Sequence, residues 1–368
     1  MYSDASASNH KNRRTGSRLW RSLPPPLQRG LKAAPVIGPL LQAHGLFPEL
    51  QAQVGELHAQ AAALLSQLAA AVQQSTHAAA QSQRQAQAQE QQQRLEALLR
   101  ELTIGQNMQV WRNIADDPER RAVSALECFG RKGYSQNDED GILIEIFRRI
   151  GIAHRTFVEV GVGNGLENNT ALWLKQGWRG AWFEGNPHHM RFIRENFAPA
   201  IAAKQLTAVE TLVNRENCSG LIADAGFTGE IDLLSIDVDG NDYYIFEQLR
   251  GITPRVVVIE YNAKFPPPLR WVIPYDPGFI WDGSDWFGAS LEAMNDVFRQ
   301  KGYCLVGCNV TGANAFFVRD DLVVNRFHRP GEVAAHYQPA RYFLTMGLFA
   351  YLGGHPASPR GGLNPAAR

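Results

Sequence analysis

The stretch Glu159-Val160-Gly161-Val162-Gly163-Asn164-Gly165 decides the fold, because it ends a buried apolar strand, predicted over residues 156–162, with a glycine-rich turn. Glycines let a backbone turn tightly and approach a ligand closely. In an open α/β sheet, ligands bind in the crevice beyond the carboxyl ends of the strands. A glycine-rich turn alone is a weak signal, so its meaning depends on the segments around it.

Apolar patterns typical of strand and helix alternate through residues 134–325, which we predict to form one domain. Further strands are predicted over residues 180–184, 206–209, 231–238 and 255–261, and helices over residues 140–150, 170–176, 188–197, 218–225 and 243–249. Strands that alternate with helices at this spacing predict βαβ units and a mostly parallel sheet covered on both faces.

The last two strands, predicted over residues 303–310 and 314–318, follow a helix over residues 291–301. Only the run Thr311-Gly312-Ala313 connects them, which is too short for a crossover, so these two strands must pair antiparallel. We therefore predict an α/β fold with a seven-stranded, mostly parallel Rossmann-like sheet and a terminal antiparallel hairpin. This plan resembles that of the S-adenosylmethionine-dependent methyltransferases.

Two details of the glycine turn favour S-adenosylmethionine over a dinucleotide as its ligand. The dinucleotide fingerprint needs a glycine three positions after its second glycine, and Leu166 stands there. Glu159, two residues before the first glycine, suits a cationic ligand better than a pyrophosphate. Glu184 ends the next strand, about 20 residues further on. A carboxylate there can accept hydrogen bonds from both ribose hydroxyls. The predicted cofactor-binding residues are Glu159, Gly161, Gly163, Asn164, Gly165, Glu184 and Asp237.

A second motif, Ile236-Asp237-Val238-Asp239-Gly240-Asn241-Asp242, lies at the carboxyl end of the fourth predicted strand. Asp237 and Asp239 stand two apart on an extended segment and are expected to point to the same side. They are the predicted catalytic residues, with Asp237 as the base for an attacking hydroxyl. In the alternative interpretation, Asp237 only supports the methionine end of the cofactor or caps the following helix.

The same acids indicate a metal site. Asp237, Asp239 and Glu260, with Asn262 just beyond the fifth strand, would form an oxygen-rich site of the kind that Mg²⁺ prefers. The expected cofactors are therefore S-adenosylmethionine and, as an open question, a divalent cation.

Three stretches together resemble the FkbM family of methyltransferases: Tyr134 to Gly141, Phe157 to Thr170 and Leu234 to Asp242. The resemblance covers roughly residues 130–325. It implies S-adenosylmethionine-dependent methylation of a hydroxyl, often on a sugar or a natural product. Asp239 stands where the family commonly has Glu, and Asn241 where it commonly has His.

The predicted function is therefore an O-methyltransferase that acts on a sugar, a polysaccharide or another glycan-like acceptor. Phe265–Phe287, an aromatic and proline-rich segment, follows the fifth strand and carries Trp271, Tyr275, Trp281 and Trp286. Its rings would suit stacking on a sugar, and the alternative is an ordinary packed loop. A second hypothesis for the whole chain is an oligomeric interaction protein whose methyltransferase-like domain does not catalyse turnover.

Residues 1–45 precede the fold as a basic, proline-containing arm. Within residues 1–32, seven Lys and Arg residues are accompanied by a single acid, Asp4. We predict a flexible arm, and its simplest interpretation is a solvated tail without a partner. The alternative is weak attraction to anionic lipid, as a peripheral membrane contact, or to nucleic acid.

Residues 46–103 are rich in Ala and Gln and are predicted to form a long helix. Their apolar residues are spaced alternately by three and four: Val54, Leu57, Ala61, Leu64, Leu68 and Ala71. This seam predicts a coiled coil that joins copies of the chain into a homo-oligomer, and a solitary linker helix is the alternative. We expect a helical bridge over residues 104–133, and a C-terminal helix with a disordered tail over residues 326–368.

Composition limits the partners and the compartment. Lys and Arg number 36, as do Asp and Glu, so the formal net charge is zero and no specific nucleic-acid partner is expected. Four cysteines without a clustered pattern indicate a reducing compartment. No stretch approaches the roughly 20 apolar residues that cross a bilayer, and no secretory signal is expected, so we predict a cytoplasmic protein.

Overall fold

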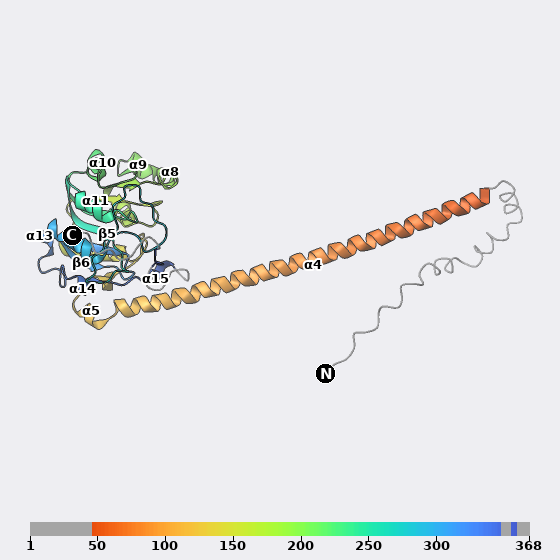
Figure 1. Ribbon diagram of the computed structural model, residues 1–368, viewed down its shortest axis with the longest axis horizontal. Helices are drawn as coiled ribbons and strands as arrows, with labels where there is room; N and C mark the ends of the chain where they lie inside the picture. Colours follow the sequence, from red (N-terminus) through yellow and green to blue (C-terminus); the bar gives the residue numbers. More distant parts are fainter. Residues whose placement is uncertain (1–45, 347–354, 359–368) are drawn as a thin grey trace, which may run out of the picture. The chain divides into compact units, whose positions relative to one another are not determined.

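The computed structural model of the protein describes residues 46–346 and 355–358 (Figure 1). The chain divides into two units, residues 1–94 and residues 95–368. Among the described residues, the first unit contains only part of one long helix, α4 (Leu46–Ala115). The second unit contains the α/β domain.

Helix α4 continues past its predicted end at residue 103 as far as Ala115. Its apolar side chains are exposed in the single chain; those of Leu57, Leu64 and Leu68 are 64%, 65% and 62% exposed. The apolar residues spaced alternately by three and four therefore lie on one continuous helix, and the coiled coil stays a prediction. Within the described residues, no helix is both long enough and apolar enough to cross a membrane.

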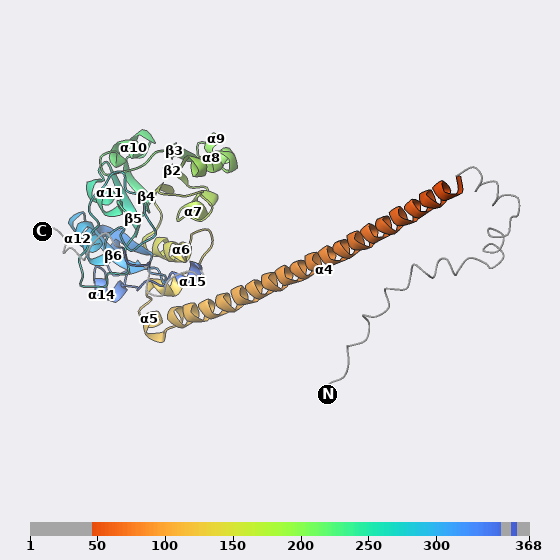
Figure 2. The same ribbon diagram turned by 45° about the vertical axis from the view of Figure 1, so that its right-hand side comes forward.

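Seven strands form one sheet in the order β3-β2-β1-β4-β5-β7-β6. Figure 2 labels β2, β3, β4, β5 and β6 of this sheet. The strands are β1 (Thr156–Val160), β2 (Arg179–Glu184), β3 (Leu206–Glu210), β4 (Gly229–Ile236), β5 (Ile252–Glu260), β6 (Tyr303–Cys308) and β7 (Asn314–Arg319). The pairs from β3 through β5 are parallel, and β7 pairs antiparallel with both β5 and β6. The predicted fold class is confirmed, including its antiparallel hairpin.

Helices cover both faces of this sheet. They are α6 (Glu139–Ile150), α7 (Ala171–Lys175), α8 (Pro187–Asn196), α9 (Ala198–Ala202), α10 (Cys218–Asp224), α11 (Asp242–Gln248) and α12 (Leu291–Gln300). Apolar side chains of α6, α7 and α8 pack in one buried cluster, and those of α10, α11 and α12 in another. Neighbouring strand residues such as Phe316 and Phe317 divide between the two clusters, because strand side chains alternate between faces.

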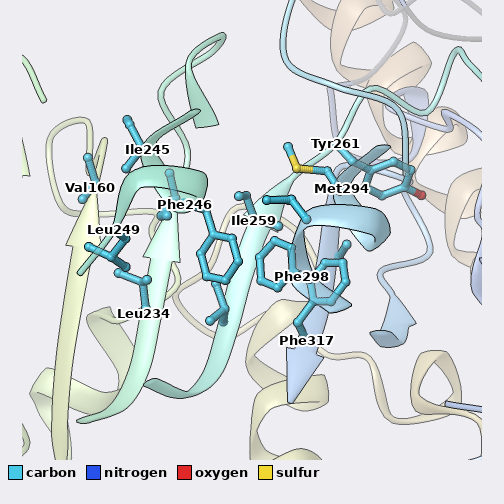
Figure 3. Close-up of a cluster of buried hydrophobic side chains, with 14 of the residues drawn as sticks. Val160, Leu234, Ile245, Phe246, Leu249, Ile259, Tyr261, Met294, Phe298 and Phe317 are labelled. Carbon is cyan, nitrogen blue, oxygen red and sulfur yellow. The ribbon is translucent and has the colours of Figure 1, made fainter. Parts of the chain in front are cut away.

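Three stacked aromatic rings hold α11 in place (Figure 3). The ring of Phe298 lies 3.6 Å from that of Phe246 and 3.7 Å from that of Phe317, measured between centroids. These residues come from α12, α11 and β7, so the stack ties the antiparallel end of the sheet to its parallel part. Helix α11 begins at Asp242, the last residue of the second sequence motif, so the stack also fixes the position of that motif.

Shorter helices connect or follow these elements. They are α5 (Pro118–Ala122), α13 (Asp320–Val323), α14 (Val333–His336), α15 (Phe343–Met346) and the 3₁₀ helix η1 (Leu126–Phe129). The predicted bridge over residues 104–133 thus contains the end of α4, α5 and η1. The predicted basic arm, residues 1–45, lies outside the described residues, as do residues 347–354 and 359–368.

Residues 355–358, part of the tail that we predicted to be disordered, are described and hydrogen-bonded to the domain. The backbone N–H of Asp285 donates to the backbone oxygen of Pro356 at 2.9 Å, and the N–H of Ser358 donates to the Asp285 carboxylate at 2.7 Å. These two hydrogen bonds join a short tail segment to the domain, and the disordered tail stays a prediction.

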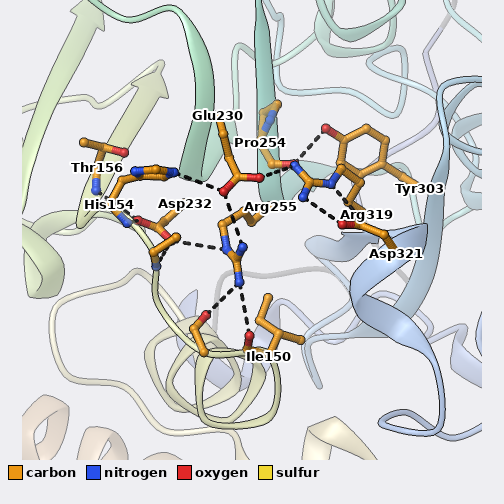
Figure 4. A network of polar contacts seen from close by, with 12 residues as sticks. Ile150, His154, Thr156, Glu230, Asp232, Pro254, Arg255, Tyr303, Arg319 and Asp321 are labelled. Atoms are coloured by element: carbon orange, nitrogen blue, oxygen red, sulfur yellow. Dashed lines mark hydrogen bonds and ion pairs between the residues drawn. The ribbon is translucent and has the colours of Figure 1, made fainter.

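A polar network joins β4, β5 and β7 to the segment that follows α6 (Figure 4). Asp232 is fully buried and accepts hydrogen bonds from the backbone N–H groups of Ala153 and His154 at 2.8 and 2.7 Å. The Nε of Arg255 lies 3.4 Å from the same carboxylate. Arg255 therefore balances a charge that cannot reach water.

Replacing Arg255 by Met is expected to leave the Asp232 carboxylate buried without its cation, at a cost of about 3 kcal/mol in the free energy of unfolding. Urea denaturation measures this loss. The control is Arg194→Met, which breaks an exposed ion pair with Glu210 and should change the same free energy by less than about 1 kcal/mol. Equal losses in the two variants would contradict this account.

Candidate active site

The glycine turn after β1 lies against the end of β4. Gly161, Gly163 and Gly165 all have left-handed backbones, with φ of +82°, +57° and +78°, a conformation that other residues rarely adopt. A Cβ atom placed on Gly161 would overlap the backbone oxygen of Asp237, so no side chain fits there. The two motifs found in the sequence therefore touch through their backbones.

Asn164 and Gly165 complete the turn in different ways. The Asn164 side chain is exposed, and its Oδ1 accepts a hydrogen bond from the Leu166 N–H at 3.0 Å. A Cβ atom on Gly165 would lie 2.7 Å from the indole of Trp182. Gly165 thus allows the turn to pack on the domain, while Asn164 presents a side chain at its outer edge.

Glu184, at the end of β2, faces the same turn. Its Oε2 accepts a hydrogen bond from the Gly163 N–H at 2.8 Å, and its Oε1 accepts one from the Asn186 N–H at 2.7 Å. A ring nitrogen of His189 lies 3.6 Å from the same carboxylate. The acid predicted to bind ribose is therefore next to the cofactor turn, and the ribose contact itself stays a prediction.

Glu159 has a different environment from the one we expected. Its carboxylate is buried and accepts hydrogen bonds from the Asn168 side chain at 2.7 Å and from the backbone N–H groups of Asn169 and Thr170 at 2.9 and 3.1 Å. Burial raises the pKa of Glu159 to about 7. These contacts join Glu159, in β1, to the residues between the glycine turn and α7. Glu159 therefore stabilises the turn and does not face a ligand.

Three carboxylates gather where β4 and β5 end. One carboxylate oxygen each from Asp237, Asp242 and Glu260 lies within 4.8 Å of the other two. Burial, and then the charges of Asp239 and Asp242, raises the pKa of Asp237 well above its usual range. Burial, and then the charge of Asp237, does the same to the pKa of Glu260. A cation beside the group would therefore favour its ionised form.

Asp242 belongs to this cluster, although the sequence pointed to Asp239 as the metal-ligating neighbour. The Asp242 carboxylate accepts hydrogen bonds from the backbone N–H groups of Val238 and Gly240 at 2.9 and 3.0 Å, and it is fully buried. Burial raises its pKa to about 6. Asp239 is exposed and has a left-handed backbone, with φ of +58°. The chain therefore turns at Asp239, so the alternation expected of an extended segment does not apply.

A pocket of about 110 Å³ opens above these acids. It is lined by Gln136, Asn137, Asp237, Asp239, Glu260, Trp281, Phe287, Ala313, Tyr342, Thr345 and His355. Carboxylates and aromatic rings both line the pocket. The arrangement can accept hydrogen bonds from hydroxyl or amino groups while it covers an apolar face of the same molecule.

Several of these lining residues were not among the predicted site residues. Gln136 and Asn137 belong to a stretch that carried the family resemblance, so a signal existed but gave them no role. Asn137 is held by Glu139, whose carboxylate accepts hydrogen bonds from its N–H and its side chain at 2.9 and 3.0 Å. Tyr342 and His355 lie in the C-terminal region, where no motif marked them.

One part of the aromatic segment Phe265–Phe287 lines the pocket, and another part is an ordinary packed loop. Trp281 and Phe287 line the pocket. Trp271 is 3% exposed and packs against the ring of Phe265 at 4.5 Å, which is ordinary loop packing. Asn262, considered as a further metal ligand, instead uses its side-chain amide to hold this segment, donating to the backbone oxygen of Phe287 at 3.0 Å.

Comparisons with known proteins add little to this geometry. No family model matches the sequence, and no curated protein matches it. Among solved structures, the pyocyanin biosynthetic protein PhzM is similar at 16% identity and a TM-score of 0.31, over 48% of this chain and 54% of that protein, about half its length.

Two further structures are similar over more of their own length. An O-methyltransferase from Bacillus cereus in complex with SAH matches at 13% identity and a TM-score of 0.31, over 58% of this chain and 88% of that one. An S-adenosylmethionine-dependent methyltransferase from Clostridium acetobutylicum matches at 10% identity and a TM-score of 0.32, over 58% and 98%. At these identities and TM-scores, the similarity carries no argument about the activity of this chain.

Gly161→Ala is expected to destabilise the protein by at least about 2 kcal/mol, because the new methyl group would collide with the Asp237 backbone and the left-handed conformation would be strained. Urea denaturation measures the effect. Gly163→Asn is the control, because a Cβ atom there meets nothing within 4 Å and Asn tolerates this conformation. A tolerated alanine at position 161 would show that the two motifs are not in contact.

The stability of the protein is expected to fall as the pH rises from 4.5 to 7. The folded state raises the pKa of Glu159 from 4.5 to about 7, so over this range the folded chain holds a proton that the unfolded chain has lost. A tenfold difference in proton affinity corresponds to about 1.4 kcal/mol, so the free energy of unfolding should fall by up to about 3 kcal/mol.

Urea denaturation between pH 4.5 and 8 measures this slope. In Glu159→Gln the slope should be shallower, because position 159 no longer titrates. Glu167→Gln, on an exposed side chain, should retain the wild-type slope. A wild-type stability that rises with pH over this range would contradict the assignment.

Proposed function

We propose that this protein is an S-adenosylmethionine-dependent O-methyltransferase. The observation that carries the proposal is the contact between the two motifs: the glycine turn after β1 binds Glu184 on one side and packs on the Asp237 backbone on the other. A candidate cofactor site and a cluster of bases thereby lie at the carboxyl ends of adjacent strands, where open α/β sheets bind ligands.

Glu184 and the turn would hold the cofactor in this proposal. The Glu184 carboxylate would accept hydrogen bonds from the ribose hydroxyls, and the exposed backbone of Gly163 and Asn164 would lie along the rest of the ligand. Leu212, which is 54% exposed and next to Gly185, offers an apolar surface for the adenine. When bound, S-adenosylmethionine supplies the methyl group. Glu159 acts through the turn and does not touch the ligand.

Asp237 is the proposed base. Its carboxylate lines the pocket, and burial raises its pKa well above its usual range, which makes it a stronger proton acceptor than an exposed aspartate. The hydroxyl of the acceptor would pass its proton to Asp237 while its oxygen takes the methyl group. Asp239, at the exposed turn of the same run, would bind another hydroxyl of the acceptor and orient it.

A glycan-like acceptor is the proposed substrate class. The resemblance to the FkbM family implies a sugar hydroxyl, and the pocket chemistry supports it. Carboxylates accept hydrogen bonds from hydroxyl groups, the rings of Trp281 and Phe287 can cover a sugar face, and the acidic lining disfavours an anionic acceptor. We also propose that the reaction takes place in the cytoplasm, which agrees with four free cysteine thiols.

A divalent cation fits the carboxylate cluster and is proposed as a second cofactor. Asp237, Asp242 and Glu260 would supply its oxygen ligands, in place of the set with Asp239 that the sequence indicated. Glu260 Oε2 is buried and has no hydrogen-bond partner among the described residues, as expected of an atom that faces a cation. The cation would balance the crowded charges and lower the pKa of an acceptor hydroxyl.

Calorimetric titration with S-adenosylmethionine is expected to detect binding to the wild-type protein. Glu184→Gln should weaken it at least tenfold through the lost ribose contacts, and the control Glu210→Gln, at the exposed end of β3, should bind as the wild type does. Asp237→Asn should abolish methyl transfer while it leaves the affinity for the cofactor nearly unchanged.

Each part of the proposal fails separately in that experiment. If the wild type does not bind S-adenosylmethionine, the proposal that the protein is an enzyme fails. Equal losses of binding and transfer in Asp237→Asn would reassign Asp237 to the cofactor. Repeating the titration with MgCl₂ alone tests the cation, which should bind the wild type and not Asp242→Asn.

The competing function is an oligomeric interaction protein without turnover. The exposed leucines of α4 favour association in either case, and we propose that copies of the chain pair through this helix. For the basic arm, we propose weak attraction to anionic membrane surfaces, which a vesicle co-sedimentation assay at low and high salt tests.

Replacing Leu57, Leu64 and Leu68 together by Ser is expected to dissociate the oligomer, because their side chains form the apolar seam. Light scattering gives the mass of the assembly. The double variant Ala59→Ser and Gln73→Ser, which changes the opposite side of the helix, should keep the wild-type mass. A monomeric wild-type protein would exclude the coiled coil.

A further inference from the structure

The segment His355–Ser358 is fixed to the domain by two side chains that act together. The Lys264 Nζ donates a hydrogen bond to the backbone oxygen of His355 at 2.8 Å and forms an ion pair with Asp285 at 2.7 Å. Asp285 donates its backbone N–H to Pro356 and accepts the Ser358 N–H. We call Lys264 and Asp285 the clip. Three hydrogen bonds on four residues make this a docked segment.

The clip sets the imidazole of His355 among three aromatic rings. Its centroid lies 4.6 Å from the ring of Trp281, 5.6 Å from that of Phe287 and 5.0 Å from that of Tyr342. Burial, and then the charge of Lys264, lowers the pKa of His355. The imidazole is therefore neutral at neutral pH and suited to an aromatic environment.

The same four rings line the pocket above the carboxylates. Asp237, Glu260 and His355 all line it. Neither the glycine turn nor Glu184 lines this pocket. The tail segment therefore bounds the space where an acceptor would stand, and not the space where the cofactor would bind.

The geometry points to His355–Ser358 as a wall of the acceptor pocket, with His355 as a specificity-determining residue and the clip as the device that positions it. That the pocket receives an acceptor rests on the proposed function, whereas the docked wall itself rests only on contacts of the chain. The wall limits the size of the molecule that can reach Asp237 and Glu260, and it shields these carboxylates from water.

Chemical labelling of carboxylates tests the wall without turnover. A water-soluble carbodiimide with glycinamide converts accessible carboxyl groups to amides, and mass spectrometry of peptides counts the product at Asp237 and Glu260. Lys264→Met and His355→Ala should each raise the yield at both positions several-fold in the full-length protein. The control is Arg270→Met, in the same loop as Lys264, which removes an ion pair with Asp296 of α12 and should leave the yield as in the wild type.

Nuclear magnetic resonance of histidine-labelled protein reports on docking. Ring currents should move the His355 Cε1–H resonance, assigned with His355→Asn, away from its position in an unstructured peptide. Lys264→Met should return it to that position. An unshifted His355 resonance in the wild type would overturn the inference that this segment is a wall of the pocket. The same holds if Lys264→Met releases His355 and the labelling yield at Asp237 and Glu260 does not change.

Titration with S-adenosylhomocysteine separates this inference from the proposed function. Lys264→Met should bind it with the wild-type affinity, because the wall lies on the acceptor side. A comparable loss of affinity would move the segment to the cofactor side and overturn the assignment. If the wild type binds none, the proposed function fails, while the labelling still decides whether the wall exists.

Discussion

The candidate site depends on how closely two backbones approach. The turn after β1 passes so near the end of β4 that the place of a Cβ atom on Gly161 is occupied by the backbone oxygen of Asp237. Parallel pairing of β1 with β4 brings the two strand ends level, with Val160 opposite Ile236. Any shift of that register would separate the glycine turn from the acidic run that lines the pocket.

Charge crowding is the second constraint on the site. Asp237, Asp242 and Glu260 lie close together and partly or fully buried, so repulsion and lost hydration both oppose their ionisation. The fold tolerates this because neighbouring packing holds the groups in place: the stacked rings of Phe246 and Phe298 anchor the helix that begins at Asp242. A ligand that brings positive charge changes the energy of the whole cluster.

The architecture is predictable because it follows from local patterns, whereas the site depends on distant partners. Alternating apolar runs locate the strands, and a three-residue connection requires the antiparallel pairing of the last two. Glu159 was expected to face a ligand, but Asn168, Asn169 and Thr170 use its lone pairs. Asp242 takes the place expected of Asp239, because a left-handed residue interrupts the extended segment. No motif marks His355, since its position depends on Lys264 and Asp285, far earlier in the chain.

The docked tail has a practical consequence for shortening the protein. A chain cut after Arg319 would keep all seven strands and the glycine turn, so it would look complete by the usual criterion of an intact sheet. It would nevertheless lack Tyr342 and His355, which belong to the pocket. Such a fragment would keep the glycine turn and Glu184 without the complete pocket, so a negative result from a ligand screen with it would not apply to the whole chain.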